Sequence, residues 1–284
     1  MYDCAIVGSG PAGLSAALTL KALNKNIIWL GSKELSGKIK RAEKIRNYPG
    51  LENVSGTQMQ EAFLSQITSM ELQITEKTVT AVCRMGDYYG ILCNQEVFEA
   101  RTVILATGVD AVKPIKGELE FLGRGVSYCA TCDGFLYKDK KIAVICTSKQ
   151  LEHEIEYLAE FASEVYLFPL YRDVNVKAKN IKIYSGMPEE VTGAQKAERL
   201  VLKDGTLHID GVFMLKESIA PSALVGGLET IDGHVKVDRA SKTNLVGCFA
   251  AGDCTGRPYQ YAKAVGEGNV AAHSVNEYLA TITE

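Results

Sequence analysis

The stretch Ala5-Ile6-Val7-Gly8-Ser9-Gly10-Pro11-Ala12-Gly13 lies near the start of the chain and decides its fold. The apolar residues before Gly8 predict a buried strand, and Leu14 to Leu23 predict a helix directly after Gly13. The glycine spacing between them is the fingerprint of a dinucleotide-binding turn, and this strand and helix provide the context that the fingerprint needs. The first glycine permits a tight turn, the second lets the backbone approach a pyrophosphate, and the third allows close helix–strand packing. We therefore predict nucleotide binding here rather than a purely structural turn.

Three further strand ends complete this predicted nucleotide domain. The next strand, Asn26 to Leu30, ends in Gly31-Ser32 and lacks the Asp or Glu that usually binds a ribose hydroxyl. Thr102 to Gly108 and Gly247 to Cys254 are also apolar strands with small residues at their ends. Each would be an ordinary strand–helix turn if it stood alone. Together with the first turn, they predict one nucleotide domain built from both ends of the chain.

The segment between these ends has a strand–helix rhythm of its own. Lys141 to Cys146 predicts a strand, Leu151 to Phe161 a helix, and Glu164 to Phe168 another strand. The predicted fold class is therefore α/β, with two nested Rossmann-like (three-layer) domains. We place the discontinuous first domain at residues 1–113 and 236–284 and the inserted domain at 114–235. Short linkers are expected near Val112 to Gly117 and His234 to Asp238.

A Cys-x-x-Cys pair lies near the start of the inserted segment and is followed at once by an acid, as Cys129-Ala130-Thr131-Cys132-Asp133. Two thiols at this spacing can close a disulfide, and one thiolate of such a pair is often stabilised near neutral pH. The adjacent Asp133 can hold or release the proton that thiol–disulfide exchange moves. The alternative is half of a zinc site, but none of the 4 histidines and other cysteines supplies a second ligand pair at metal spacing. We predict a redox pair and no metal.

Composition excludes several other classes of function. The chain has 284 residues, of which 46% are hydrophobic and 23% charged, and this describes a globular protein with a core. A net charge of −3 gives no basic field for nucleic acid, and no apolar run approaches the ~20 residues of a membrane helix. The 8 cysteines include only one tight pair, which is not a secreted disulfide framework. We expect a cytoplasmic protein without nucleic-acid or membrane partners.

Several motifs in one order resemble the low-molecular-weight thioredoxin reductases, across essentially the whole chain. They are Gly8 to Gly13, Asn47-Tyr48-Pro49-Gly50, Ala106-Thr107-Gly108, Cys129 to Gly134 and Ala250-Ala251-Gly252-Asp253. The resemblance implies a FAD-containing homodimer, with FAD in the discontinuous domain and the dithiol in the inserted one. It also implies that Cys132 lies against the flavin, that Cys129 attacks the partner disulfide, and that Asp133 handles the proton.

The same resemblance implies a set of FAD contacts. Asp253 matches the residue that holds the ribityl and phosphate region, and Gln260 to Ala262 match the turn along the flavin ring. The full implied set is Gly8, Ser9, Gly10, Pro11, Ala12, Gly13, Gly31, Ser32, Lys38, Ile39, Asn47, Ala106, Thr107, Gly108, Gly252, Asp253, Gln260, Tyr261 and Ala262.

The inserted segment departs from the family where NADPH would bind. The family has a second Gly-x-Gly-x-x-Ala there, whereas Cys146 and Ser148 occupy the glycine positions and Leu151 the small one. A β-carbon at these places blocks close approach of a pyrophosphate to the backbone. NADPH is therefore not expected, and the alternative is a divergent site that still binds it.

Two further pieces of that site are changed. Glu152, Glu154 and Glu156 follow in the helix, where their charge would repel a phosphate, and the basic cluster is reduced to Tyr171-Arg172. The glycine-bearing strand end that closes the family's pocket is replaced by Met214-Leu215-Lys216-Glu217-Ser218.

A retained flavin and dithiol without an NADPH site resembles the ferredoxin-dependent flavin thioredoxin reductases of anaerobic bacteria. We therefore predict a flavin-dependent disulfide reductase that passes electrons from reduced ferredoxin to thioredoxin. Because ferredoxins are usually acidic, the basic segment Lys33 to Arg46 is a candidate docking surface, and the alternative is an ordinary solvated loop. Three other functions stay open: an NADPH-dependent thioredoxin reductase, a flavin dithiol oxidase that uses oxygen, and a flavin-bound redox sensor or scaffold.

Overall fold

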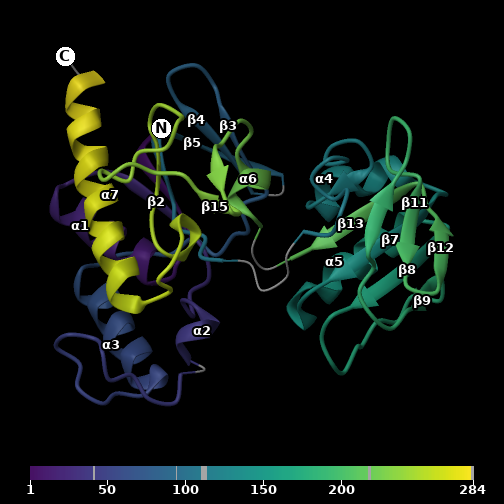
Figure 1. Ribbon diagram of the computed structural model, residues 1–284, viewed down its shortest axis with the longest axis horizontal. Coiled ribbons are helices and arrows are strands. Elements are labelled where there is room, and N and C mark those ends of the chain that lie inside the picture. Colours follow the sequence, from purple (N-terminus) through teal and green to yellow (C-terminus); the bar gives the residue numbers. More distant parts are fainter. Residues whose placement is uncertain (41, 94, 110–113, 217–218, 283–284) are drawn as a thin grey trace. The chain divides into compact units, whose positions relative to one another are not determined.

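The chain folds into two compact units, which are described separately here (Figure 1). The computed structural model describes residues 1–40, 42–93, 95–109, 114–216 and 219–282, with the exception of the Lys38 side chain. Unit 1 consists of Met1–Val109 and Ala220–Glu284, and unit 2 is Asp110–Ile219. Each unit contains a sheet with parallel strands and helices packed against it, which confirms the predicted α/β class with one domain inserted into another.

Unit 1 is built from both ends of the chain. Its elements are β1 (Tyr2–Val7), α1 (Pro11–Ala22), β2 (Ile27–Leu30), α2 (Gly37–Lys40), α3 (Gly56–Ser69), β3 (Ala81–Arg84), β4 (Tyr89–Cys93), β5 (Glu96–Leu105), α6 (Pro221–Leu224), β14 (Thr230–Ile231), β15 (His234–Val235), β16 (Cys248–Ala250), the 3-10 helix η3 (Asp253–Thr255) and α7 (Tyr261–Ile282).

The sheet of unit 1 follows the order β2-β1-β5-β4-β3, and β16 also pairs with β5. β1 pairs in parallel with β2 and β5, and β16 runs parallel to β5, so four strands point the same way. β4 is antiparallel to β5 and pairs with its first half: Tyr89 pairs with Ala100, and Cys93 pairs with Glu96. This pairing explains why β5 begins at Glu96, earlier than the predicted start at Thr102.

Two helices from opposite ends of the sequence pack together in unit 1. α7 runs alongside α1 (Figure 1), and Gly268 of α7 lies where a Cβ would be 2.2 Å from the carbonyl oxygen of Ala12. The core between these helices and the sheet contains Leu14, Leu20 and Val275, which are almost completely buried. This contact joins the two parts of the sequence that form unit 1.

Helix α1 begins three residues before the predicted start at Leu14, because Pro11 occupies its first turn. Proline already has a helical φ there, and its missing N–H is one that the first helical turn leaves unused. Gly10 is the N-cap, with φ −71° and ψ −175°. The helix therefore points its N-terminus directly at the glycine-rich turn.

Unit 2 contains a parallel sheet and a smaller antiparallel one. The five-stranded sheet has the order β6-β13-β7-β8-β9, with all neighbours parallel, and the three-stranded sheet has the order β10-β11-β12. The elements are β6 (Val126–Ser127), α4 (Ala130–Asp133), the 3-10 helix η1 (Gly134–Tyr137), β7 (Lys141–Cys146), the 3-10 helix η2 (Lys149–Leu151), α5 (Glu152–Phe161), β8 (Glu164–Pro169), β9 (Ile181–Ile183), β10 (Glu190–Thr192), β11 (Arg199–Leu202), β12 (Gly205–His208) and β13 (Gly211–Leu215).

The unit boundaries differ from the predicted domain boundaries. Residues 220–235 belong to unit 1, whereas the prediction places them in the inserted domain. They group with unit 1 because α6 packs against β3 and β15, and because Val225 forms a bridge with Val82. The chain therefore leaves unit 2 near Ile219, well before the predicted linker at His234 to Asp238. The beginning of the other predicted linker, Val112-Lys113, lies outside the described residues.

No helix among the described residues is long and apolar enough to cross a membrane. Cys129 and Cys132 form a disulfide, and of the other six cysteines only Cys83 is exposed. Burial raises the pKa of Cys4 and Cys248 to about 12 and that of Cys146 and Cys254 to about 11.

These thiols give a prediction for alkylation of the oxidised protein. At pH 8 a thiol of pKa 11 is thiolate in about one molecule in a thousand, so iodoacetamide should modify Cys83 and leave Cys146 unmodified. Mass spectrometry of the intact protein should show one adduct, and denaturation should expose the buried thiols to reagent. Modification of Cys146 as fast as that of Cys83 in the folded protein would contradict the packing around β7.

Candidate functional site

The predicted cofactor residues of unit 1 come together at one edge of its sheet. β1, β2, β5 and β16 are parallel, so their carboxyl ends meet at the same edge, where α/β sheets bind ligands. Backbone hydrogen bonds tie these ends together: Gly8 N donates to Leu30 O at 2.8 Å, and Ala251 N donates to Leu105 O at 3.0 Å. The turns at Gly8–Gly13, Gly31-Ser32, Ala106–Gly108 and Gly252-Asp253 all follow these four strands.

The glycine-rich turn leaves open space only at its middle glycine. A Cβ on Gly8, whose φ is +112°, would lie 2.2 Å from the carbonyl oxygen of Ala106, and one on Gly13 would lie 1.9 Å from that of Gly8. Both glycines are therefore needed for packing. At Gly10 the nearest heavy atom to such a Cβ is the Cβ of Ser36, at 4.0 Å. This opening at the N-terminus of α1 fits the pyrophosphate of a dinucleotide cofactor.

The turn after β2 packs onto the glycine-rich turn. Ser9 Oγ accepts a hydrogen bond from Ser32 N at 2.9 Å, and a Cβ on Gly31 would lie 2.7 Å from the same Oγ. The lack of a side chain at Gly31 is thus a packing requirement. Trp29 reinforces the arrangement, because its indole N–H donates to Gly8 O at 3.0 Å.

Other predicted contacts lie at the start of α7 and in the segment before α3. Asn47 Nδ2 donates to Gln260 Oε1 at 2.6 Å, so two residues far apart in the sequence meet. Tyr261 begins α7, and burial together with the nearby Asp253 raises its pKa. The side chain of Ile39 is 1% exposed within the core, and its backbone N–H donates to Ser36 O at 3.0 Å. The predicted contact through Lys38 concerns a side chain outside the described residues.

A polar network that the sequence analysis does not predict supports the Gly252-Asp253 turn. Lys263 Nζ donates to Gly252 O at 2.7 Å, to Thr255 Oγ1 at 2.9 Å and to Gly256 O at 2.8 Å. Glu267, one helical turn later, accepts from Gly252 N at 2.8 Å and pairs with Lys263 at 3.0 Å. The spacing of Lys263 and Glu267 on a predicted helix is the sequence signal that could have revealed the network.

In unit 2, the Cys129–Cys132 disulfide lies where β6 ends. Cys129 is the N-cap of the short helix α4, and its Sγ accepts a hydrogen bond from Cys132 N at 3.1 Å. The Cα atoms of the two cysteines are 5.3 Å apart. Cys129 is 5% exposed and Cys132 is half-buried, so the disulfide is largely shielded from solvent.

Asp133 is held by a residue next to the dithiol. Ser127 Oγ donates to Asp133 Oδ2 at 2.6 Å and accepts from Cys129 N at 3.0 Å. A single hydroxyl therefore joins the candidate proton-handling acid to the backbone of Cys129. The sequence analysis assigns no role to Ser127. No group of three His, Cys, Asp or Glu side chains that could hold a metal ion occurs in the part of the chain that the structure describes.

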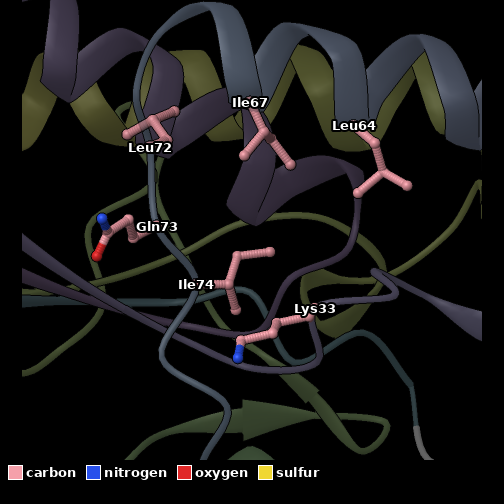
Figure 2. A pocket seen from close by; sticks show the side chains of 6 residues that line it. All are labelled: Lys33, Leu64, Ile67, Leu72, Gln73 and Ile74. Atoms are coloured by element: carbon pink, nitrogen blue, oxygen red, sulfur yellow. The ribbon is translucent and has the colours of Figure 1, made fainter.

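An open groove of about 400 Å³ borders the end of β2 (Figure 2). Leu64 and Ile67 of α3 line one side of the groove. Leu72, Gln73 and Ile74 line the other side, and they belong to the segment whose Thr75 forms a bridge with Leu30 of β2. Lys33 is the positively charged residue among those that line the groove. Figure 2 shows the apolar side chains of the two segments gathered around the same space.

Comparison with known proteins agrees with this geometry. The family model "Pyridine nucleotide-disulphide oxidoreductase" matches residues 2–148 and 171–268. The thioredoxin reductase of Helicobacter pylori (strain J99) is 34% identical, and the match covers 98% of this chain and 99% of that protein. The chain belongs to the pyridine nucleotide-disulphide oxidoreductase family.

Two crystal structures of a ferredoxin-flavin thioredoxin reductase from Clostridium acetobutylicum are more similar still. They are 44% and 48% identical to this chain, with TM-scores of 0.90 and 0.89, and each match covers 99% of this chain and 98% of that one. The predicted resemblance is thus confirmed, and the chain is a flavoprotein disulfide oxidoreductase of the thioredoxin reductase type. The Cys129–Cys132 pair fits the Cys-x-x-Cys of such an enzyme.

The contrast between Gly8 and Gly10 gives a prediction for this member of the family. Gly8→Ala should lower the free energy of unfolding by more than ~2 kcal/mol, because the left-handed φ and the Ala106 carbonyl leave no place for a methyl group. Gly10→Ala should change the unfolding of the flavin-free protein by less than ~0.5 kcal/mol but weaken FAD binding at least about tenfold.

Denaturant unfolding of the flavin-free protein and quenching of FAD fluorescence measure the two effects. Gly226→Ala is the matched control, because no heavy atom lies within 4 Å of its added Cβ and its φ is not left-handed, and it should change neither property. If Gly10→Ala bound FAD as tightly as the unchanged protein, the turn could not be the pyrophosphate site.

Proposed function

We propose that this protein is a FAD-dependent disulfide reductase that passes electrons from reduced ferredoxin, through FAD and the Cys129–Cys132 dithiol, to thioredoxin. The observation that carries the proposal is that protein side chains occupy the region of unit 2 where the family binds NADPH. Its strand end and helix start are filled by side chains and by a neighbouring loop of the same unit. The similarity to the ferredoxin-flavin thioredoxin reductase of Clostridium acetobutylicum supports the same choice of donor.

Side chains occupy the turn after β7, where a nucleotide phosphate would approach the backbone of a glycine-rich turn. Cys146 is completely buried, its Sγ donates to Ser148 O at 3.2 Å, and burial raises the pKa of its thiol to about 11. Ser148 Oγ accepts from Gln150 N at 3.3 Å and thereby begins the 3-10 turn η2. A backbone N–H that a phosphate would use in a glycine-rich turn is therefore bonded to this serine.

Carboxylates occupy the start of helix α5, which follows this turn. Glu152 Oε1 accepts hydrogen bonds from Asn175 N at 2.8 Å and from Tyr171 OH at 3.1 Å, and Glu156 accepts from Lys177 N. The loop after β8, which carries a basic cluster in the family, is thus fastened to the helix by acids of α5. A bound phosphate would have to displace these bonds and face two negative charges.

In unit 1, the residues present fit FAD. Gly10 leaves the opening for a pyrophosphate, and Lys263 with Glu267 holds the Gly252-Asp253 turn at the same edge. A bound flavin accepts electrons singly from an iron–sulfur donor and passes a pair to a disulfide. The absence of a ribose-binding acid after β2 is explained by the close packing of Gly31 on Ser9.

The chemistry of the dithiol falls to four residues of unit 2. Reduction of the disulfide takes up two electrons and two protons, and Asp133 is the nearby acid that can supply one of them. Ser127 keeps that carboxyl directed by its 2.6 Å hydrogen bond. The Cys129 thiolate then attacks the thioredoxin disulfide, and the released thioredoxin thiolate takes a proton. Attack of Cys132 on Cys129 Sγ releases the second thiolate and re-forms the Cys129–Cys132 disulfide.

A surface for a protein disulfide lies directly after the dithiol. Phe135 and Leu136 of η1 are 58% and 61% exposed, although both are large and apolar. Exposed apolar side chains of this size mark places where another protein docks. Their position, two and three residues after Asp133, suits contact with thioredoxin while Cys129 exchanges.

The basic segment Lys33 to Arg46 is the surface that we assign to ferredoxin. Lys33, Lys40, Lys44 and Arg46 are exposed, whereas Arg41 lies outside the described residues. Lys33 also lines the apolar groove of Figure 2, so a basic surface adjoins an apolar one. Charged surfaces steer an acidic partner, and apolar ones hold it after encounter.

We extend the proposal to a homodimer in the cytoplasm, on the basis of the family resemblance and the cysteines. The six cysteines outside the dithiol remain unpaired, and five of them are buried, which suits a reducing compartment.

The donor can be tested by anaerobic reduction of the flavin. Enzymatically reduced ferredoxin should bleach the flavin absorbance rapidly, whereas NADPH and NADH should not bleach it on the same timescale, because unit 2 offers them no phosphate site. Rapid bleaching by NADPH would refute the proposed donor and favour a divergent NADPH site. Rapid oxygen uptake with a small dithiol, without reduction of thioredoxin, would favour the dithiol oxidase.

The docking surface is tested in the same assay. Lys40→Glu with Lys44→Glu should slow bleaching by ferredoxin about tenfold at low salt and flatten its salt dependence. The control, Lys177→Glu with Lys179→Glu, reverses two exposed lysines of unit 2 and should leave the rate unchanged. Equal rates for both double variants would contradict the assignment of the basic segment as the ferredoxin docking surface.

The roles of the two cysteines can be tested by covalent trapping. Cys132→Ser should react through Cys129 with a single-cysteine thioredoxin that carries a thionitrobenzoate group, releasing thionitrobenzoate and keeping a mixed disulfide. Cys129→Ser is the matched variant and should trap at least about tenfold less complex, because Cys132 is assigned to the flavin rather than to the partner. More complex with Cys129→Ser than with Cys132→Ser would reverse the assignment.

A further inference from the structure

A buried charged cluster in unit 2 lies beside the dithiol. The carboxylate of Glu118 is completely buried and pairs with Lys216, whose Nζ is 2.6 Å from Oε1. Tyr128 OH donates to the same oxygen at 2.5 Å, and Lys216 Nζ lies 5.7 Å from the centre of the Tyr128 ring. We call Glu118, Tyr128 and Lys216 the Glu118 cluster. None of its members is used by the dithiol chemistry derived above.

The Glu118 cluster connects three segments that are far apart in the sequence. Glu118 belongs to the segment by which the chain enters unit 2, and its Oε2 accepts from Ile115 N at 2.9 Å. Lys216 directly follows β13 and belongs to the segment by which the chain leaves unit 2, which ends at Ile219. Tyr128 directly precedes Cys129. One carboxylate therefore joins both connecting segments to the dithiol loop.

Glu118 and Lys216 hold each other strongly, because neither can be withdrawn without leaving the charge of the other buried and unpaired. Glu118 is 0% exposed and Lys216 is 5% exposed, so water does not replace a lost partner. Removing one partner of a buried pair is much more destabilising than replacing both with apolar groups. The three segments are thus fixed to one another by a contact that tolerates little movement.

We infer that the Glu118 cluster positions the redox dithiol. Glu118 and Lys216 fix the Tyr128 hydroxyl, and Tyr128 fixes the adjacent backbone of Cys129 next to Cys132. Ser127 holds the same loop from the other side of Tyr128, because its hydroxyl accepts from Cys129 N at 3.0 Å. The inference concerns the disulfide of unit 2 and does not depend on which electron donor serves the flavin.

Such positioning has a measurable consequence for the thiol–disulfide equilibrium. In glutathione buffer, two glutathione thiols supply two electrons and two protons, the Cys129–Cys132 disulfide becomes a dithiol, and one glutathione disulfide forms. A loop that keeps Cys129 near Cys132 raises the effective concentration of one thiol for the other and favours the closed disulfide. Loosening the loop should shift the equilibrium toward the dithiol.

Tyr128→Phe is the most direct variant, since it removes one hydroxyl and keeps the ring. In the holoenzyme at pH 7, we expect the equilibrium constant to shift at least about threefold toward the dithiol, from the loss of one hydrogen bond to a carboxylate. The matched control is Tyr166→Phe, which removes a 2.9 Å hydrogen bond between Tyr166 and Glu164 on β8 and should leave the equilibrium unchanged. Thermal unfolding of both variants measures the purely structural loss.

The ion pair is tested with Lys216→Met, Glu118→Gln and the double variant. Each single variant should lower the melting temperature and shift the equilibrium in the same direction, and the double variant should recover much of the melting temperature. Lys116→Met removes an ion pair with Glu190 in the same connecting segment, where Lys116 is exposed, and should have little effect.

The two measurements separate positioning from stability. If Tyr128→Phe lowers the melting temperature but shifts the equilibrium by less than about threefold, or if Tyr166→Phe shifts it equally, the Glu118 cluster is structural only and the inference is overturned. Because Tyr128→Phe keeps the buried ion pair, this result can be obtained even where a Lys216 or Glu118 variant fails to fold.

Discussion

The close approach of backbone to backbone at the glycine-rich turn is the constraint on which unit 1 depends. Gly8 passes the carbonyl of Ala106 so closely that a methyl group would lie 2.2 Å from its oxygen, and Gly13 approaches the carbonyl of Gly8 even more closely. These two contacts fix the turn between β1 and α1 against β5. Because α7 packs on α1 through Gly268, the C-terminal part of the chain takes its place from the same turn. The cofactor edge is assembled from both chain ends for this reason.

The two units use the same kind of sheet edge in different ways. In unit 1 the turn at the carboxyl edge is open at Gly10, so backbone N–H groups at the start of α1 can face a ligand. In unit 2 the corresponding turn after β7 carries the side chains of Cys146 and Ser148, and Glu152 accepts a hydrogen bond from Asn175 N in the loop after β8. The disulfide of unit 2 lies at the end of a different strand, β6. The division of roles follows from side chains placed on similar frameworks.

Much of this could be predicted from sequence, because the decisive signals are local. The Gly8-x-Gly10-x-x-Gly13 spacing predicts the first strand, turn and helix, and the Cys129–Cys132 spacing predicts the disulfide. The predicted start of α1 is wrong by three residues, because Pro11 fits the first helical turn and the helix begins there. The boundary of the inserted segment differs because residues 220–235 form only short elements, and their packing on β3 has no sequence signature.

The unpredicted parts of the candidate site are contacts between residues far apart in the chain. Glu118 and Lys216 are separated by 98 positions, and neither residue type is expected in a core until its partner is known. Ser127 was visible in the sequence, but a hydroxyl has many possible partners, and only the fold brings it to Asp133. Lys263 and Glu267, by contrast, belong to a network that helical spacing could have indicated. Sequence periodicity thus predicts local contacts, whereas buried polar pairs between distant residues become visible only in the folded structure.

The loop fastened to α5 also limits how the protein could be re-engineered or could evolve. Installing glycines at Cys146 and Ser148 would open the turn but leave Glu152 bonded to Asn175 N and Tyr171. Replacing Glu152 alone would leave that backbone N–H without its acceptor before any nucleotide could compensate for the loss. Opening the turn and releasing the loop therefore require separate substitutions. A phosphate site at this turn is therefore more than one substitution away from the present arrangement.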